Sequence, residues 1–70
     1  MKVAFAISRK VGSAVVRNRL RRRLRAMFDG VSNDLQQGLY LVKCDIRTKD
    51  LTYDELHSQL HEALRGAGVL

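Results

Sequence analysis

Bulky and small residues alternate over the first strand-length segment of the chain, which is typical of a strand with one buried face. The bulky positions are Val3, Phe5 and Ile7. The next apolar positions recur at helical spacing and span an arc of roughly 120° on a helix; they are Val16, Leu20, Leu24, Met27 and Phe28. Gly12 predicts a turn between the two elements. Ser13 is a suitable N-cap, so we expect a helix that reaches about Asp29 and stops at Gly30.

A polar connection over residues 31–38 separates this pair from a second strand at Leu39–Ile46. Alternation there places one set of side chains on a single face, namely Tyr40, Val42, Cys44 and Ile46. The order strand, helix, strand is then completed by a further amphipathic segment.

Thr52 and Glu55 form a capping box, and Leu51 with Leu56 fits the hydrophobic staple across it. We therefore expect a second helix that ends at Gly66, with a core stripe of Tyr53, Leu56, Leu60, Ala63 and Leu64. The whole chain, residues 1–70, is predicted to be one domain of the α/β class, a two-layer α+β unit with the order β-α-β-α.

Charge changes this picture of a small, ordinary domain. The 70 residues carry a net charge of +6. Residues 1–25 hold nine basic side chains and no acidic one, whereas residues 26–70 hold four basic and seven acidic side chains. Six of the nine are arginines between Arg17 and Arg25. Because the planar guanidinium suits phosphate oxygens, this segment indicates an anionic partner.

The predicted helix presents these arginines on nearly every side except its apolar stripe. Asn18, Arg22 and Arg25 lie opposite the stripe, Arg17 and Arg21 flank one side, and Arg19 and Arg23 flank the other. Successive cations along a rigid rod suit a polyphosphate backbone. Asn18 could bind a base edge or a sugar hydroxyl, or equally cap a neighbouring turn.

Other interpretations of the basic helix are a solvated face, a helix lying on a membrane, and a generic DNA- or RNA-binding module. The missing acidic residues disfavour the first, and the narrow apolar arc, which the sheet needs, disfavours the second. Nearly uniform arginine leaves few side chains that could discriminate between bases in a DNA groove.

Catalytic chemistry is not indicated by the remaining residues. His57 and His61 have chelating i, i+4 spacing but no implied third ligand, so we interpret them as surface residues. Cys44 is expected to be a small buried hydrophobe. The carboxylates that could hold magnesium show no defined spacing; they are Asp45, Asp50 and Asp54. Phe5, Tyr40 and Tyr53 could stack on bases, although packing is the simpler expectation.

The segment Ser8–Arg25 reads SRKVGSAVVRNRLRRRLR and strongly resembles the signature of the bacterial ribonuclease P protein component. The Arg17-Asn18-Arg19 core and the positions of Ser8, Lys10 and Gly12 match. The later segments GLYLV, at residues 38–42, and LTYDEL, at residues 51–56, are also similar to that family, and all 70 residues can be placed.

This resemblance implies an RNA-binding subunit that assists a catalytic RNA in removing the 5′ leader from precursor tRNA. It implies a left-handed crossover between parallel strands, no cofactor on the protein, Mg²⁺ at the RNA, one protein per RNA and no obligate protein partner. By position, the implied RNA contacts are Ser8, Arg9, Lys10, Arg17, Asn18, Arg19, Arg21, Arg22 and Arg25. Arg23 stands where the family more often has an apolar residue and is a weaker candidate.

The chain departs from the family at its beginning, because family members carry a basic helix and at least one strand before the point matched by Met1. We therefore expect an N-terminally truncated version whose helix is suited to RNA but whose leader cleft is incomplete. The first residues are a poor signal peptide, and no apolar run approaches the roughly 20 residues that cross a bilayer. A cytoplasmic protein with a reduced Cys44 is expected, without a membrane partner.

Overall fold

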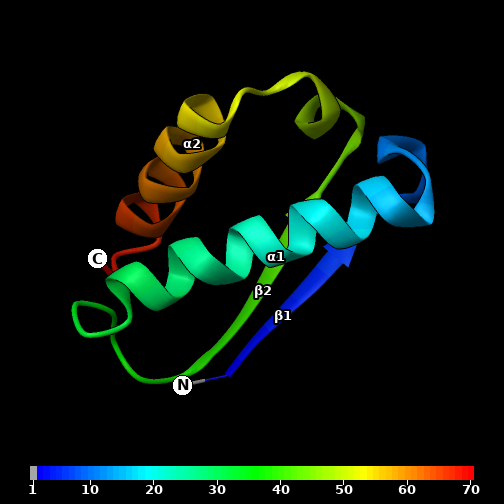
Figure 1. Cartoon of the computed structure of the whole chain (residues 1–70). Coiled ribbons are helices and arrows are strands. Elements are labelled where there is room, and N and C mark those ends of the chain that lie inside the picture. The colour runs from blue at the N-terminus through cyan, green and yellow to red at the C-terminus, as the bar shows by residue number, and fades with distance from the viewer. Residues whose placement is uncertain (1) are drawn as a thin grey trace.

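Six elements follow one another in the computed structural model, which describes residues 2–70 (Figure 1). They are the strand β1 (Lys2–Ile7), the 3₁₀ turn η1 (Arg9–Val11), the helix α1 (Ala14–Val31), the strand β2 (Leu39–Cys44), the 3₁₀ turn η2 (Ile46–Asp50) and the helix α2 (Tyr53–Gly66). The expected order β-α-β-α is confirmed, with a short turn added after each strand.

The two strands pair in parallel, with Lys2 opposite Leu39 and Ile7 opposite Cys44. A parallel pair needs a crossover, which α1 provides. Figure 1 shows α1 passing in front of the sheet, with β2 to the left of β1 when both strands point upward. This arrangement is a left-handed crossover, as the family resemblance implies, and an exception to the usual right-handed rule.

One face of the sheet carries the core, because the helices cover it. Phe28 and Leu24 of α1 are the most deeply buried large side chains. The other buried residues are Val11, Leu20, Met27, Leu35, Cys44, Leu56, Leu60 and Leu64. On the opposite face of the sheet, Leu39 is 83% exposed and Leu41 is 60% exposed. The fold is therefore two-layered, with α1 and α2 on one side of a two-stranded sheet.

Both predicted helix starts are confirmed at the level of single hydrogen bonds. The Ser13 hydroxyl accepts a hydrogen bond from the Val16 N–H at 3.3 Å. In the capping box, the Glu55 N–H donates to Thr52 Oγ1 at 3.2 Å, and the Thr52 N–H donates to Glu55 Oε1 at 3.1 Å. These side chains satisfy N–H groups that a helix cannot pair internally.

Two predicted boundaries are wrong. α1 continues through Gly30 to Val31, because Val31 packs against the core and offsets the roughly 1 kcal/mol penalty of a helical glycine. The strand β2 ends at Cys44 rather than Ile46, because β1 ends opposite it at Ile7. The Asp45 side chain then accepts from the Arg47 N–H and starts η2.

The predicted core stripes need correction at their ends. Val16 is 40% exposed and Tyr53 is 49% exposed, and each lies in the first turn of its helix. Ala63 is also exposed. Conversely, Val11 and Leu35 lie in segments that carry no periodicity, yet both are buried.

The capping box predicts a pH effect on stability. Hydrogen bonds from the Thr52 backbone and then its side chain lower the pKa of Glu55. Because the pKa is lower in the folded state, the ionised Glu55 stabilises the fold at pH values above its ordinary pKa of about 4.3. This stabilisation is lost as the pH falls through the folded-state pKa. Glu55→Gln can form the same capping box but does not titrate. In urea unfolding, we expect the stability advantage of the wild type over this variant at pH 7 to shrink at pH 3; an equal difference at both pH values would contradict the assignment.

Candidate nucleic-acid interface

η1 meets the start of α1 at the right of Figure 1, and these two segments carry the basic residues Arg9, Lys10, Arg17 and Arg19. The Ser8 hydroxyl accepts a hydrogen bond from the Lys10 N–H at 3.2 Å and so begins η1. Only Gly12 and Ser13 lie between η1 and α1. This tight turn needs glycine, since a Cβ at Gly12 would lie 2.9 Å from Val16 Cγ1. The turn places Arg9 and Lys10 immediately before the arginine helix.

The positive charge of α1 is not neutralised within the described chain. The ion pair found among residues 2–70 joins Arg47 to Asp45, outside α1. The first turn of α1 contains no acidic residue, although the positive end of the helix dipole favours one there. The arginines therefore repel one another without internal compensation, and an external anion would relieve that repulsion.

Arg17, Arg21 and Arg25 follow one another at i, i+4 spacing on one flank of α1. Arg25 is expected opposite the apolar stripe, and the structure instead brings it to β1. The Arg25 guanidinium carbon lies 5.4 Å from the centroid of the Phe5 ring, a cation–π contact. Arg17 is half-buried, and its Nε atom is buried without a hydrogen-bond partner in the described part of the chain. On this flank, the sheet therefore positions Arg25 through Phe5.

Asn18 makes a side-chain hydrogen bond with Arg21, one helical turn further along α1. Its Oδ1 atom accepts a hydrogen bond from Arg21 Nη1 at 2.8 Å. The sequence left two roles open for Asn18, a base contact and a local cap. The structure shows a third role, in which Asn18 orients a guanidinium. Reducing the rotamer freedom of Arg21 lowers the entropy cost of any contact that this side chain makes.

Three aromatic rings, those of Phe5, Phe28 and Tyr40, pack together beneath Arg25. Phe28 meets Phe5 edge-on, with ring centroids 6.1 Å apart, and lies 6.0 Å from the Tyr40 ring. Tyr40 also donates its hydroxyl proton to the Gln36 carbonyl. Phe5 and Tyr40 thus pack as core residues, and Phe5 additionally positions Arg25. Sequence reasoning missed this second role because the two residues meet only in the fold.

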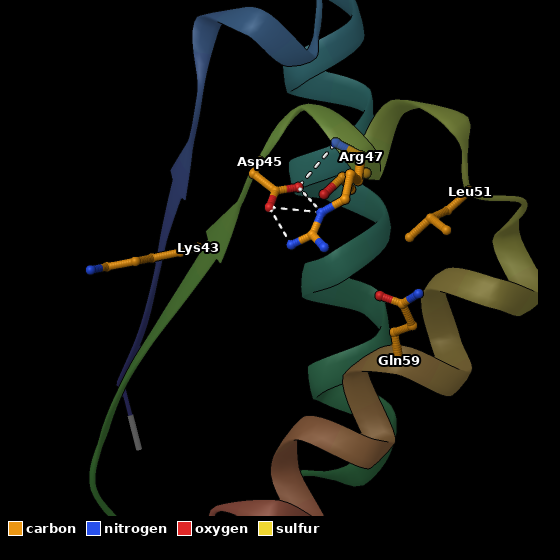
Figure 2. A pocket seen from close by; sticks show the side chains of 6 residues that line it. Lys43, Asp45, Arg47, Leu51 and Gln59 are labelled. Atoms are coloured by element: carbon orange, nitrogen blue, oxygen red, sulfur yellow. Dashed lines mark hydrogen bonds and ion pairs between the residues drawn. The ribbon is translucent and has the colours of Figure 1, made fainter.

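A polar pocket at the end of β2 contains one of the carboxylates that the sequence raised as a magnesium ligand (Figure 2). Arg47 donates to Asp45 from Nη2 at 2.8 Å and from Nε at 3.2 Å. These hydrogen bonds from the Arg47 side chain lower the pKa of Asp45. Figure 2 shows Lys43 pointing away from this pair. Asp45 is therefore already occupied by a neighbouring cation.

The histidines and Cys44, which the sequence raised as candidates for chemistry, have structural contacts instead. Residues 2–70 contain no group of three or more His, Cys, Asp or Glu side chains that could hold a metal. His61 Nδ1 lies 3.0 Å from the His57 carbonyl oxygen, and the two rings stack at 4.2 Å. Cys44 is 7% exposed, as expected of a small core residue. Burial raises the pKa of its thiol, which opposes thiolate chemistry.

None of the helices in the described region combines the length and apolar character needed to cross a membrane.

The family model described as Ribonuclease P matches residues 1–68. The chain belongs to the ribonuclease P protein family. The resemblance carried by Ser8–Arg25 is thus confirmed over nearly the whole sequence.

Relatives and a solved structure agree with this ribonuclease P assignment. The chain is 34% identical to the ribonuclease P protein component of a Geobacillus species, covering 99% of this chain and 60% of that protein. It is 39% identical to the Symbiobacterium thermophilum protein, covering 99% and 61%. A Staphylococcus aureus RNase P protein mutant with defective mRNA degradation activity superposes with a TM-score of 0.90 at 26% identity, covering 97% of this chain and 58% of that one. The chain thus spans about 60% of the length of these ribonuclease P proteins.

Proposed function

We propose that the chain acts as an RNA-binding protein subunit of ribonuclease P and assists the catalytic RNA in removing the 5′ leader from precursor tRNA. The observation that carries the proposal is the unpaired arginine face of α1 in a chain of this family. Its partners would be the ribonuclease P RNA, in a 1:1 complex, and precursor tRNA, in the cytoplasm.

In this proposal the RNA backbone lies along α1 and reaches η1. The helix supplies Arg17, Asn18, Arg19, Arg21, Arg22 and Arg25, and the strand end and turn supply Ser8, Arg9 and Lys10. Each phosphate that a cation neutralises releases condensed counterions, so binding should weaken steeply with salt. Phosphate contacts fix position and carry little sequence information. The chain would therefore hold RNA by backbone charge and shape.

The chain's own residues would orient and neutralise RNA and would take no part in bond cleavage. Mg²⁺ bound by the RNA would supply the cleavage chemistry, whereas the described residues do not fit a metal site. Lowering the repulsion between two RNAs is a role that arginines on a rigid helix can fill. The benefit should be largest when magnesium, which also screens phosphates, is scarce.

The direct test is cleavage of precursor tRNA by ribonuclease P RNA at limiting magnesium, with and without the chain. We expect the chain to raise the cleavage rate at low magnesium and to have little effect at high magnesium. Failure to bind the RNA, or binding without any gain in cleavage, would contradict the proposal. A preference for duplex DNA in a competition assay would instead support a generic nucleic-acid module.

A further inference from the structure

A pocket lies between α1 and η2, on the flank of the helix that faces away from β1. We call it the α1–η2 pocket and define it by Val16, Arg19, Leu20, Arg23, Lys49 and Leu51. Arg19 and Arg23 stand one helical turn apart on α1, and Lys49 comes from η2. The turns η1 and η2 pack together beside this pocket.

Charge distinguishes this pocket from the one at the end of β2. Three cations line the α1–η2 pocket, and no acidic residue does. In the other pocket, Asp45 and Arg47 neutralise each other. The ion pair that the structure shows among residues 2–70 does not involve any of the three cations. The α1–η2 pocket is therefore complementary to an anion.

The apolar part of the pocket restricts what kind of anion would fit. Val16 belongs to the apolar stripe of α1 but remains 40% exposed, and it lines the pocket with Leu51. A free inorganic anion would leave these side chains in water. A nucleotide would place its phosphate among the cations and its base or sugar over the apolar side chains, which removes apolar surface from water.

We propose that the α1–η2 pocket is a second RNA-binding site on the chain, which takes a nucleotide of the RNA strand through Arg23, Lys49 and Arg19. This inference rests on the proposed function, because it extends the RNA path from α1 to η2. It assigns a phosphate contact to Arg23, where the family more often has an apolar residue, and to Lys49, which no sequence motif marks. The chain would thus contact RNA on two flanks of α1, one with Arg25 and the other with Arg19 and Arg23.

The test compares binding of ribonuclease P RNA by Arg23→Gln, Lys49→Gln and the double variant over a range of salt concentrations. Each substitution should make the negative slope of log K against log salt shallower by about 0.7–0.9 and weaken binding about 5- to 8-fold at 0.1 M salt. Arg65→Gln is the matched control, because Arg65 is an exposed residue near the end of α2, outside the pocket. It removes the same charge and should change affinity less than 2-fold.

A second readout detects contact directly. Lys49→Cys carrying a photoactivatable aryl azide should crosslink to the RNA, with the wild type treated identically as background, since Cys44 is buried. The inference is overturned if the Arg23 and Lys49 variants match Arg65→Gln and no crosslink forms while Arg22→Gln still weakens binding. If Arg22→Gln also leaves binding unchanged, the proposed function fails as well.

Discussion

Replacing Arg21, Arg22 and Arg25 together with glutamine is expected to weaken binding of ribonuclease P RNA about 100- to 500-fold at 0.1 M salt. Arg22 and Arg25 are exposed and Arg21 is half-buried, and none of the three has a carboxylate partner in the described chain. If each neutralises one phosphate, the negative slope of log K against log salt should become shallower by about 2–3 in total. The measurement is a salt titration of binding, with circular dichroism to verify the helix content of the variant.

The matched control removes three cations elsewhere. Lys2→Gln, Lys43→Gln and Arg65→Gln together lower the net charge equally but lie outside η1 and α1. We expect this control to lose less than 10-fold in affinity, because exposed charges beyond a Debye length of about 10 Å are largely screened at 0.1 M salt. Equal losses in the two triple variants would show that net charge alone drives binding and would contradict a located interface.

Replacing Phe28 with alanine is expected to cost about 3–5 kcal/mol of unfolding free energy. Phe28 is 2% exposed and contacts both strands through Phe5 and Tyr40. A single core in a chain of this size rarely supplies more than about 3–5 kcal/mol of net stability. The variant should therefore be largely or wholly unfolded at 37 °C, as measured by thermal and urea denaturation.

The control for this prediction is Leu41→Ala, on the open face of the sheet. Leu41 is 60% exposed, so its truncation should change stability by no more than about 0.5 kcal/mol. A loss below about 1 kcal/mol for Phe28→Ala would mean that the three aromatic rings are not the centre of the core. Because Phe5 lies between Phe28 and Arg25, a folded remnant of Phe28→Ala should also bind RNA more weakly.

Local interactions explain what could be predicted from the chain alone. The elements, their caps at Ser13 and Thr52 and most of the apolar stripes follow from residues within four positions of each other. The unusual run of arginines and the family signature are equally local, so the RNA-contact candidates on α1 were accessible without a structure. Their role in contacting RNA stays a prediction.

Contacts between distant residues account for what local patterns missed. Gly30 is helical because Val31 reaches the core, and Val11 and Leu35 are buried although no periodicity marks them. The end of β2 depends on where its partner strand ends. None of these facts is encoded within a single helical turn or one alternating segment.

The sequence by itself determined the class of fold, the arginine-bearing helix and the family. Only the tertiary structure decided which residues meet each flank of that helix: Arg25 lies over Phe5, and Arg19 and Arg23 lie beside Lys49. The physical reason is that periodicity fixes where a side chain points around its own helix. Which strand or turn meets that side chain depends on how the elements pack.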